Sequence, residues 1–160
     1  MFRDCFQLLR RVATKPAAET LKLLDAALFN AIIGNAGAHG KNFSLLYKRG
    51  LTELAPLYDL LSTVAYSYLS QRFAMKFGGR RTLEEMYPAD IIIFAKEIEI
   101  RAPFVRRRMY ELAEAILDKA GMALEGLELS KDRAKIAGAY VDTIKARAEA
   151  TRKMIPSRLR

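Results

Sequence analysis

The residues best suited to chemistry lie in one glycine-rich loop and in an aspartate further along the chain. The loop, residues 34–42, contains His39, the only histidine of the protein, together with Lys41 and Asn42, and Asp59 follows it. An imidazole can accept a proton near neutral pH, so His39 is a candidate base. The alternative is that His39 is an ordinary loop residue hydrogen-bonded to the backbone.

Other catalytic and metal-binding motifs are missing from the sequence. It has no Cys/His cluster with zinc spacing, no Gly-x-Ser-x-Gly nucleophile elbow, no Walker loop and no Rossmann glycine fingerprint. Ser44 and Ser62 have no base near them in the sequence. Cys5 is better explained as a small residue on a helix face than as a nucleophile.

Two helices and a hairpin must position the loop. Apolar residues recur at helical spacing on both sides of Pro16, which predicts a short helix over about 4–15 and a second, largely buried helix. The second helix should end near Ile33, because Gly34-Asn35 is a strong stop signal. Segments 43–47 and 51–55 alternate as strands, and Gly50 suits the turn of a hairpin between them. The two helical stripes consist of Phe2, Phe6, Leu9 and Val12, then Leu21, Leu24, Leu28 and Ile32.

The rest of the chain is predicted to be mostly helical. Residues 56–72 are irregular, and 73–77 form a further short strand. A capping-box pattern over 82–85 then predicts helices from Thr82 onward. Pro88 precedes a helix over 91–100, Pro103 begins a longer helix that ends at Gly121, and a last helix runs from about Ser130 to the break before Pro156. The fold class is therefore mainly α with one small β-hairpin.

Length and composition suit a single soluble domain. The 160 residues carry 27 Lys+Arg and 18 Asp+Glu, a net charge of +9, and half of the residues are hydrophobic. One cysteine, no leader-like start and no stretch of about 20 apolar residues predict a cytoplasmic protein. The positive charge gathers at Arg80-Arg81, at Arg101 with 106–108, and in a basic tail over about 152–160. These clusters are either solvated surface or contacts for a polyanion such as nucleic acid.

Three segments of the sequence resemble the C-terminal region of HipA-type serine/threonine kinase toxins. They are GNAGAHGKNFSLLY at 34–47, LAPLYDLLS at 54–62 and AMKFGG at 74–79, and the resemblance covers roughly residues 1–120. It implies a protein-kinase-like C-terminal helical lobe, with the whole of 1–160 as one domain. It also implies a toxin–antitoxin system with a DNA-binding HipB-like antitoxin as partner, and a glutamyl-tRNA synthetase as the known type of target.

The resemblance implies roles for individual residues. Asn42 and Asp59 take the places of the Mg²⁺ ligands, with ATP as the implied nucleotide, and these oxygen donors suit a cation shared with phosphates. Lys41 either neutralises a transferred phosphate or points to solvent. Gly37 occupies the position of the catalytic Asp in the family pattern Asp-Ala-His-x-Lys-Asn. Because glycine has no proton acceptor, phosphoryl transfer loses about 10²–10⁴-fold unless another group replaces it.

A second departure concerns the ATP-binding lobe. Nothing before Gly34 supplies the Gly-rich phosphate loop, the strand lysine or the paired helix glutamate of a kinase. The expectation is therefore a kinase lobe that is catalytically inactive alone, in the manner of a pseudokinase.

Two other interpretations remain open. The chain could be a non-catalytic module that docks a HipB-like antitoxin or touches DNA through Arg80, Arg81, Arg106, Arg107 or the tail, or it could be a folded remnant without a selected function. In the case of a remnant, the face for the N-terminal lobe, with apolar residues near Phe2, Phe6 and the hairpin, should be exposed and should favour a homo-oligomer.

Overall fold

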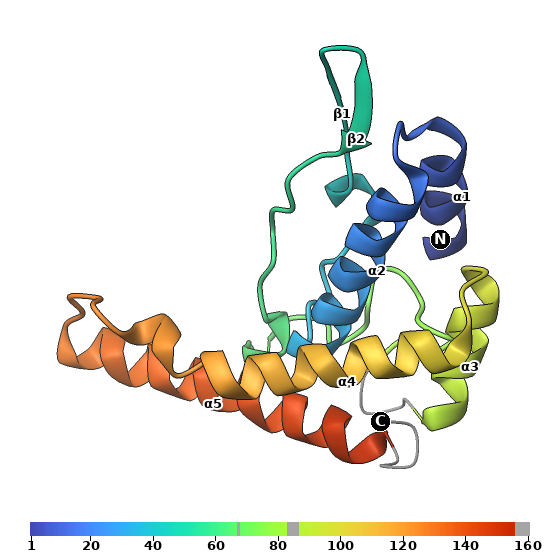
Figure 1. Ribbon diagram of the computed structural model, residues 1–160. Coiled ribbons are helices and arrows are strands. Elements are labelled where there is room, and N and C mark those ends of the chain that lie inside the picture. Colours follow the sequence, from blue (N-terminus) through green and yellow to red (C-terminus); the bar gives the residue numbers. More distant parts are fainter. Residues whose placement is uncertain (67, 83–86, 156–160) are drawn as a thin grey trace.

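A computed structural model of the chain describes residues 1–66, 68–82 and 87–155. Within these ranges the protein is mainly helical and has one small antiparallel sheet (Figure 1). The elements in chain order are α1 Phe2–Val12, α2 Pro16–Ile33, η1 Gly40–Asn42, β1 Leu45–Lys48, β2 Leu51–Leu54, η2 Thr63–Ala65, α3 Pro88–Glu97, α4 Ala102–Lys119, η3 Met122–Leu124 and α5 Lys131–Met154.

Helix α2 is the central element and contacts α1, β2, α4 and α5 (Figure 1). It begins with Pro16, whose fixed φ and missing N–H suit a first helical position. It ends at Gly34, which has a left-handed φ of 74° and donates its N–H to the Asn30 carbonyl. Both boundaries confirm the sequence prediction. Because α2 ends at Gly34, the glycine-rich loop starts directly at the end of the most buried helix.

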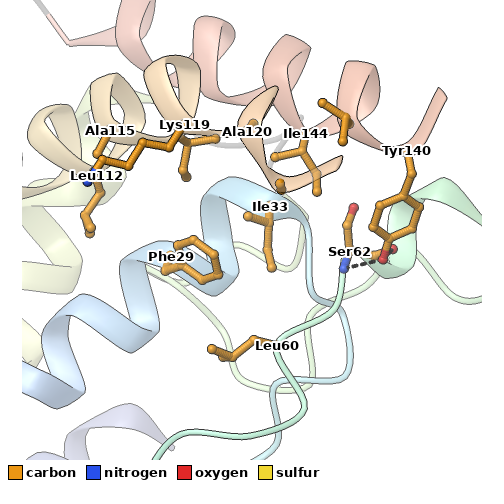
Figure 2. A pocket seen from close by; sticks show the side chains of 13 residues that line it. Phe29, Ile33, Leu60, Ser62, Leu112, Ala115, Lys119, Ala120, Tyr140 and Ile144 are labelled. Carbon is orange, nitrogen blue, oxygen red and sulfur yellow. Dashed lines mark hydrogen bonds between the residues drawn. The ribbon is translucent and has the colours of Figure 1, made fainter. Parts of the chain in front are cut away.

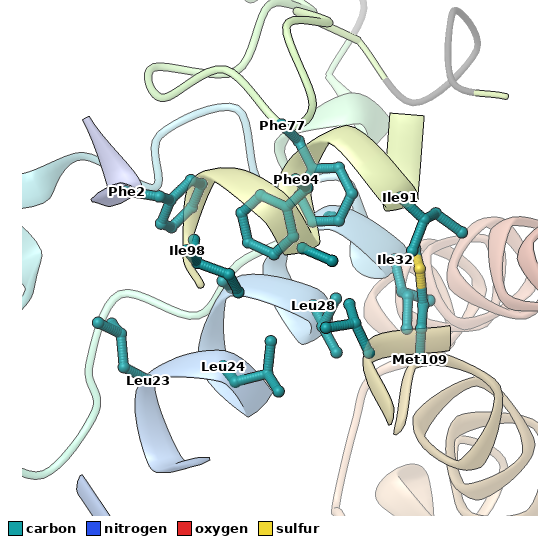
Figure 3. Packing of buried hydrophobic residues seen from close by; sticks show 14 of the residues in the cluster. Phe2, Leu23, Leu24, Leu28, Ile32, Phe77, Ile91, Phe94, Ile98 and Met109 are labelled. Atoms are coloured by element: carbon teal, nitrogen blue, oxygen red, sulfur yellow. The ribbon is translucent and has the colours of Figure 1, made fainter. Parts of the chain in front are cut away.

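The hydrophobic core lies around α2 and α3. The rings of Phe77 and Phe94 stack with their centroids 3.9 Å apart, and Phe2 meets Phe94 edge-on at 5.5 Å (Figure 3). Phe2 and Phe6 are therefore buried, at 5% and 0% exposure. The prediction that they form an exposed apolar face was wrong, because α3 supplies the Phe94 ring that packs on Phe2. The hairpin does expose apolar side chains, those of Leu46, Tyr47 and Leu51.

The predicted hairpin is confirmed, and two contacts attach it to the helices. Leu45 pairs with Leu54 and Lys48 with Leu51, and the turn places Arg49 and Gly50 at positive φ. The buried Glu19 carboxylate of α2 accepts a hydrogen bond from the Leu54 amide at 2.8 Å. On the outer edge of β2, the Thr14 amide donates to the Thr52 carbonyl at 2.9 Å, and the Thr52 amide donates to the Thr14 hydroxyl at 2.8 Å.

The strand predicted over 73–77 does not form. Phe77 makes only an isolated bridge with Arg80, because no neighbouring strand is available to the segment within the described residues. Gly78 lies so close to α3 that a Cβ there would sit 2.1 Å from the Asp90 carbonyl oxygen, at a φ of +55°. This turn therefore requires glycine. Most of the capping-box pattern at 82–85 falls on residues outside the described ranges, and Thr82 itself is not helical.

The late helices form as predicted, with small shifts of their ends. Helix α4 lies beside α5 (Figure 1). A bidentate ion pair between Arg108 of α4 and Asp25 of α2, with N–O distances of 2.6 and 2.7 Å, joins α4 to α2. Arg152, predicted to belong to a basic tail, instead lies in α5 and pairs with Glu114 of α4 at 3.0 Å. Residues 156–160 of that tail are outside the described ranges. No helix of the described residues is both long and apolar enough to cross a membrane.

Candidate functional site

The structure brings Asn42 and Asp59 into direct contact. The Asn42 side-chain amide donates a hydrogen bond to the Asp59 carboxylate at 2.7 Å and a second to the Gly37 carbonyl at 3.2 Å. Both N–H groups of the Asn42 amide are thus engaged, which leaves its carbonyl oxygen as the atom able to accept or to ligate. Asp59 is exposed and Asn42 is half-buried. The two residues predicted to share a cation are therefore neighbours at the surface.

Local backbone structure fixes each of these side chains. Asn42 ends the short η1 helix, in which its amide donates to the His39 carbonyl at 2.9 Å. Asp59 has a φ of 58°, in the left-handed region that non-glycine residues seldom occupy. Such strain persists where the surroundings determine the conformation, and it gathers at functional sites. One neighbouring contact is the hydrogen bond from the Tyr58 hydroxyl to the Lys41 carbonyl at 3.2 Å, which joins the aspartate segment to the loop.

Buried Asn35 connects the loop to the aspartate. Its side-chain amide donates to the Asp59 carbonyl at 2.7 Å and to the Asn30 side-chain oxygen at 2.9 Å. Its own side-chain oxygen accepts from the Gly37 amide at 3.0 Å. Asn35 is 1% exposed, so this amide is a fully paired buried group that orients three parts of the site at once.

Hydrogen bonds hold the chain after Asp59 at two further residues, Thr63 and Ser62. The Thr63 hydroxyl accepts from the Ala36 amide at 2.8 Å and lies 3.1 Å from the Gly34 carbonyl, to which it donates. The Tyr140 hydroxyl of α5 accepts from the Ser62 amide and donates to the Ser62 carbonyl, both at 2.8 Å. Sequence reasoning missed these contacts. Asn35 could have been found as the polar residue of a small-residue loop, whereas Tyr140 lies 78 residues from Ser62 and gave no signal.

Gly37 stands beside Asn42 with room for a side chain. Its φ is not left-handed, and an added Cβ would meet only the Asn35 side-chain oxygen, at 3.3 Å. It also borders a cavity of about 350 Å³ whose wall includes His39, Thr63 and Arg72. An aspartate would therefore fit here after a small adjustment of Asn35. The glycine is not demanded by the local backbone.

His39 and Lys41 are both exposed, and their side chains make no hydrogen bond or ion pair that fixes them among the described residues. The backbone of each is engaged: the His39 amide donates to the Gly37 carbonyl at 2.7 Å. The imidazole of His39 borders the same cavity as Gly37. The backbone of the loop is therefore held in place, but within the described ranges no contact of the His39 or Lys41 side chain indicates a chemical role.

Asn42 and Asp59 can hold a magnesium ion only together with ligands from another molecule. Mg²⁺ prefers oxygen ligands in octahedral geometry and is commonly held by one or two carboxylates together with substrate phosphates. Asn42 and Asp59 offer one amide oxygen and one carboxylate. In the ranges that the structure describes, no group of three or more His, Cys, Asp and Glu side chains is placed to hold a metal. The pair therefore suits a cation whose remaining ligands come from a nucleotide and water.

Comparisons with known proteins identify the family of the chain. Residues 1–121 match the family described as HipA-like C-terminal domain. The chain belongs to this family. The fold is a kinase-type C-terminal helical lobe, as the sequence resemblance predicted, and it superposes on a solved HipA chain.

Two relatives and one solved structure define how far the similarity extends. A Sinorhizobium fredii protein named "Putative kinase Y4mE" is 49% identical over 152 residues, which cover 94% of this chain and 36% of the relative. The serine/threonine-protein kinase toxin HipA of Shewanella oneidensis is 28% identical over 135 residues, covering 84% and 31%. The solved complex of Shewanella oneidensis HipA with HipB and operator DNA matches with a TM-score of 0.85 and 28% identity, covering 93% of this chain and 35% of that one. The chain spans about a third of the length of the curated relatives it matches.

Several arginines predicted to meet nucleic acid are engaged within the protein. Arg80 pairs with Asp90 at 3.2 Å, and Arg107 lies 3.6 Å from Glu111. Arg108 holds Asp25 in the bidentate ion pair described above. Arg81 and Arg101 are exposed. The surface available for a polyanion is therefore smaller than the sequence clusters indicated.

Proposed function

We propose that this chain is the magnesium-binding half of a HipA-like serine/threonine kinase site, and that the chain alone transfers phosphate slowly or not at all. The observation that carries the proposal is the 2.7 Å contact between Asn42 and Asp59, next to a glycine where the family pattern has aspartate. In this account Asn42 and Asp59 hold Mg²⁺ together with the phosphates of ATP.

The proposal gives a role to each residue of the site. When bound, Mg²⁺ and ATP supply the charge neutralisation and the transferable phosphoryl group. Asn42 and Asp59 position that cation, and Asn35 holds the Asp59 backbone so that its carboxylate stays next to Asn42. Lys41, exposed on the same loop, is the candidate to neutralise a phosphate. Phosphoryl transfer depends mainly on positioning and charge stabilisation, so an intact pair without the rest of the cleft binds but does not catalyse.

The proposed loss of activity has a structural cause at Gly37. The acceptor hydroxyl must lose a proton, and general-base catalysis contributes about 10²–10⁴-fold in rate. A glycine cannot accept this proton. His39 borders the same cavity and is the remaining candidate for the base.

Nucleotide titration tests the binding part. We expect the chain to bind ATP weakly and only with Mg²⁺ present, and Asp59→Asn to weaken this binding at least tenfold because it removes the charged ligand. Asp118→Asn, an exposed aspartate of α4, is the matched control and should bind as the wild type does. Equal affinity in Asp59→Asn and the wild type would refute the role of Asp59.

Restoring the carboxylate tests the catalytic part. Gly37→Asp, assayed with the N-terminal region of the 49% identical relative supplied in trans or by fusion, should raise phosphoryl transfer about 10²–10⁴-fold over Gly37 in the same assembly. An equal rate for the two forms would show that Gly37 is not what limits activity. His39→Gln in the Gly37 background then measures whether the imidazole acts as a substitute base.

A second candidate function is docking to a HipB-like antitoxin or to DNA. Its support is the net charge of +9 and the solved neighbour, which is a HipA complex with HipB and operator DNA. If DNA phosphates are contacted, affinity should fall steeply with salt, and Arg81→Ala or Arg101→Ala should reduce the slope by about one each. A flat salt dependence would remove direct DNA contact and leave the antitoxin as the partner.

A further inference from the structure

A second cavity lies between α2, α4 and α5, and Leu60 and Ser62 of the segment that follows Asp59 also line it (Figure 2). Its volume is about 380 Å³, within the range of about 300–1,000 Å³ that is typical of small-molecule sites. The wall is almost entirely apolar. Its main side chains are Phe29 and Ile33 of α2, Leu112 and Ile116 of α4, and Val141 and Ile144 of α5.

The polar groups on this wall are few, and one of them is unpaired. The Ser62 hydroxyl is buried and makes no hydrogen bond with any described residue, while Ser62 itself is 1% exposed. The Tyr140 hydroxyl, by contrast, is already engaged twice by the Ser62 backbone (Figure 2). A buried polar atom without a partner is costly, so Ser62 marks a place where an additional hydrogen-bonding group would stabilise the protein.

Positive charge accompanies the cavity at one end of α4. Lys119, the last residue of α4, contributes its side chain to the lining and is exposed. The Lys145 ammonium of α5 lies 3.3 Å from the position that a Cβ would take at Gly121, close to the lining residues Ala120 and Ala123. An apolar cavity with a cationic rim complements a molecule that has an apolar body and an anionic head.

We propose that this cavity binds a single-chain carboxylic acid. The hydrocarbon tail fills the space between α2, α4 and α5. The exposed Lys119 side chain turns from Leu112, where Figure 2 shows it, toward Ser62 and neutralises the carboxylate, and the Ser62 hydroxyl donates a hydrogen bond to that carboxylate. Lys119 favours an anionic head, because a carboxylate that is removed from water needs a paired charge and Lys119 lies in the lining to supply it. Asn42 and Asp59 are not among the residues that line this cavity, so the proposal does not depend on magnesium binding.

A chain-length series tests the apolar part. Octanoate, decanoate and dodecanoate, each below its micelle concentration, are titrated into the full chain by calorimetry. Each methylene transferred from water to an apolar cavity raises affinity about fourfold, so saturable 1:1 binding should strengthen with every added pair of carbons until the cavity is full. Dodecyltrimethylammonium, with the same tail and a cationic head, should bind at least tenfold more weakly than dodecanoate.

Variants test the location and the polar contacts. Lys119→Met keeps the aliphatic stem and Ser62→Ala removes the hydroxyl, and each should weaken decanoate binding, Lys119→Met by about tenfold or more. Lys96→Met, an exposed lysine of α3, is the matched control. Ala120→Phe should block the cavity, whereas Ala146→Phe adds the same ring on an exposed face of α5. If Ala120→Phe does not fold by circular dichroism, Ala115→Leu at the cavity wall replaces it.

The outcomes separate the proposal from its alternatives. Decanoate binding that Ala120→Phe and Lys119→Met weaken, and that the two control variants retain, establishes the site. Equal binding of the anionic and cationic amphiphiles, or unchanged binding in Lys119→Met, would indicate adsorption to an apolar surface and overturn it. Absence of saturable binding would show that the cavity stays empty and would overturn it as well.

Discussion

At the scale of single residues, the site depends on amide side chains more than on charged ones. Asn35 holds the Asp59 carbonyl, the Asn30 side chain and the Gly37 amide, and Asn42 holds the Asp59 carboxylate. An amide can donate and accept at once, so it can join a carbonyl, a carboxylate and an N–H without adding charge. This leaves Asp59 as the single negative group of the pair, available to a cation.

The Asn35 contacts predict a measurable loss of stability. Asn35→Ala leaves the Asn30 side-chain oxygen, the Gly37 amide and the Asp59 carbonyl without their partner. The Asn30 oxygen is buried, and an unpaired buried group costs about 1–3 kcal/mol, so the free energy of unfolding should fall by at least that amount. Urea unfolding followed by circular dichroism measures it. Gln71→Ala, which removes a half-buried amide whose two hydrogen bonds are exposed, is the control. A loss in Asn35→Ala no larger than in Gln71→Ala would contradict the assignment.

At the scale of elements, the hairpin is held to α2 by Glu19. Burial raises the pKa of the Glu19 carboxyl, but hydrogen bonds from Lys22 and from the Leu54 amide lower it by more, so the pKa lies below its ordinary value. The hairpin joins the segment that carries Asn42 to the segment that carries Asp59. The state of Glu19 therefore affects how firmly the two halves of the site are held.

This shift gives a pH dependence of stability. A carboxyl whose pKa is lower in the folded state contributes stability above its unfolded pKa, about 4.3, and the contribution is lost as the pH falls through the folded value. The wild type should lose more unfolding free energy than Glu19→Gln between pH 6 and pH 3, as measured by urea unfolding at each pH. Glu97→Gln, an exposed glutamate of α3, should follow the wild-type curve. Parallel curves for the wild type and Glu19→Gln would contradict the buried contact.

The sequence predicted most elements but fewer of the contacts between them. Pro16 and Gly34 are local signals, so the ends of α2 were found correctly. The 73–77 strand failed because a strand also needs a partner, and Phe77 bridges only to Arg80. The burial of Phe2 depends on Phe94, which comes much later in the chain. The pairing of Asn42 with Asp59 came from the family resemblance, and no local pattern indicated Tyr140, which lies 78 residues from Ser62.

At the scale of the whole molecule, α2 connects two ends with different roles. The hairpin and α1 lie at one end, α4 and α5 cross the other, and the segment that carries Asp59 runs between them (Figure 1). At its Ser62 end, this segment is hydrogen-bonded to Tyr140 of α5. The Asp59 carbonyl is hydrogen-bonded to Asn35 of the glycine-rich loop. The site is therefore supported by the core that surrounds α2, and its geometry should persist as long as that core is folded.

Core packing at α3 should control global stability. Phe94→Ala removes a fully buried ring that packs on Phe2 and Phe77, and such truncations cost about 3–5 kcal/mol. Ile93→Ala, next to it on the exposed face of α3, is the matched control and should cost far less. Thermal unfolding by calorimetry provides the measurement. Similar losses in the two variants would mean that α3 is not part of the common core.

The central claim is that Asn42 and Asp59 share one cation with a nucleotide. Paramagnetic broadening by Mn²⁺, used in place of Mg²⁺, locates such a cation in the NMR spectrum of the chain. With ATP present, we predict that substoichiometric Mn²⁺ broadens the amide signals of Asn42, Phe43 and Asp59 first, and that Asp59→Asn removes this effect while Asp118→Asn retains it. Broadening that begins elsewhere, or that is the same in Asp59→Asn, would contradict the account.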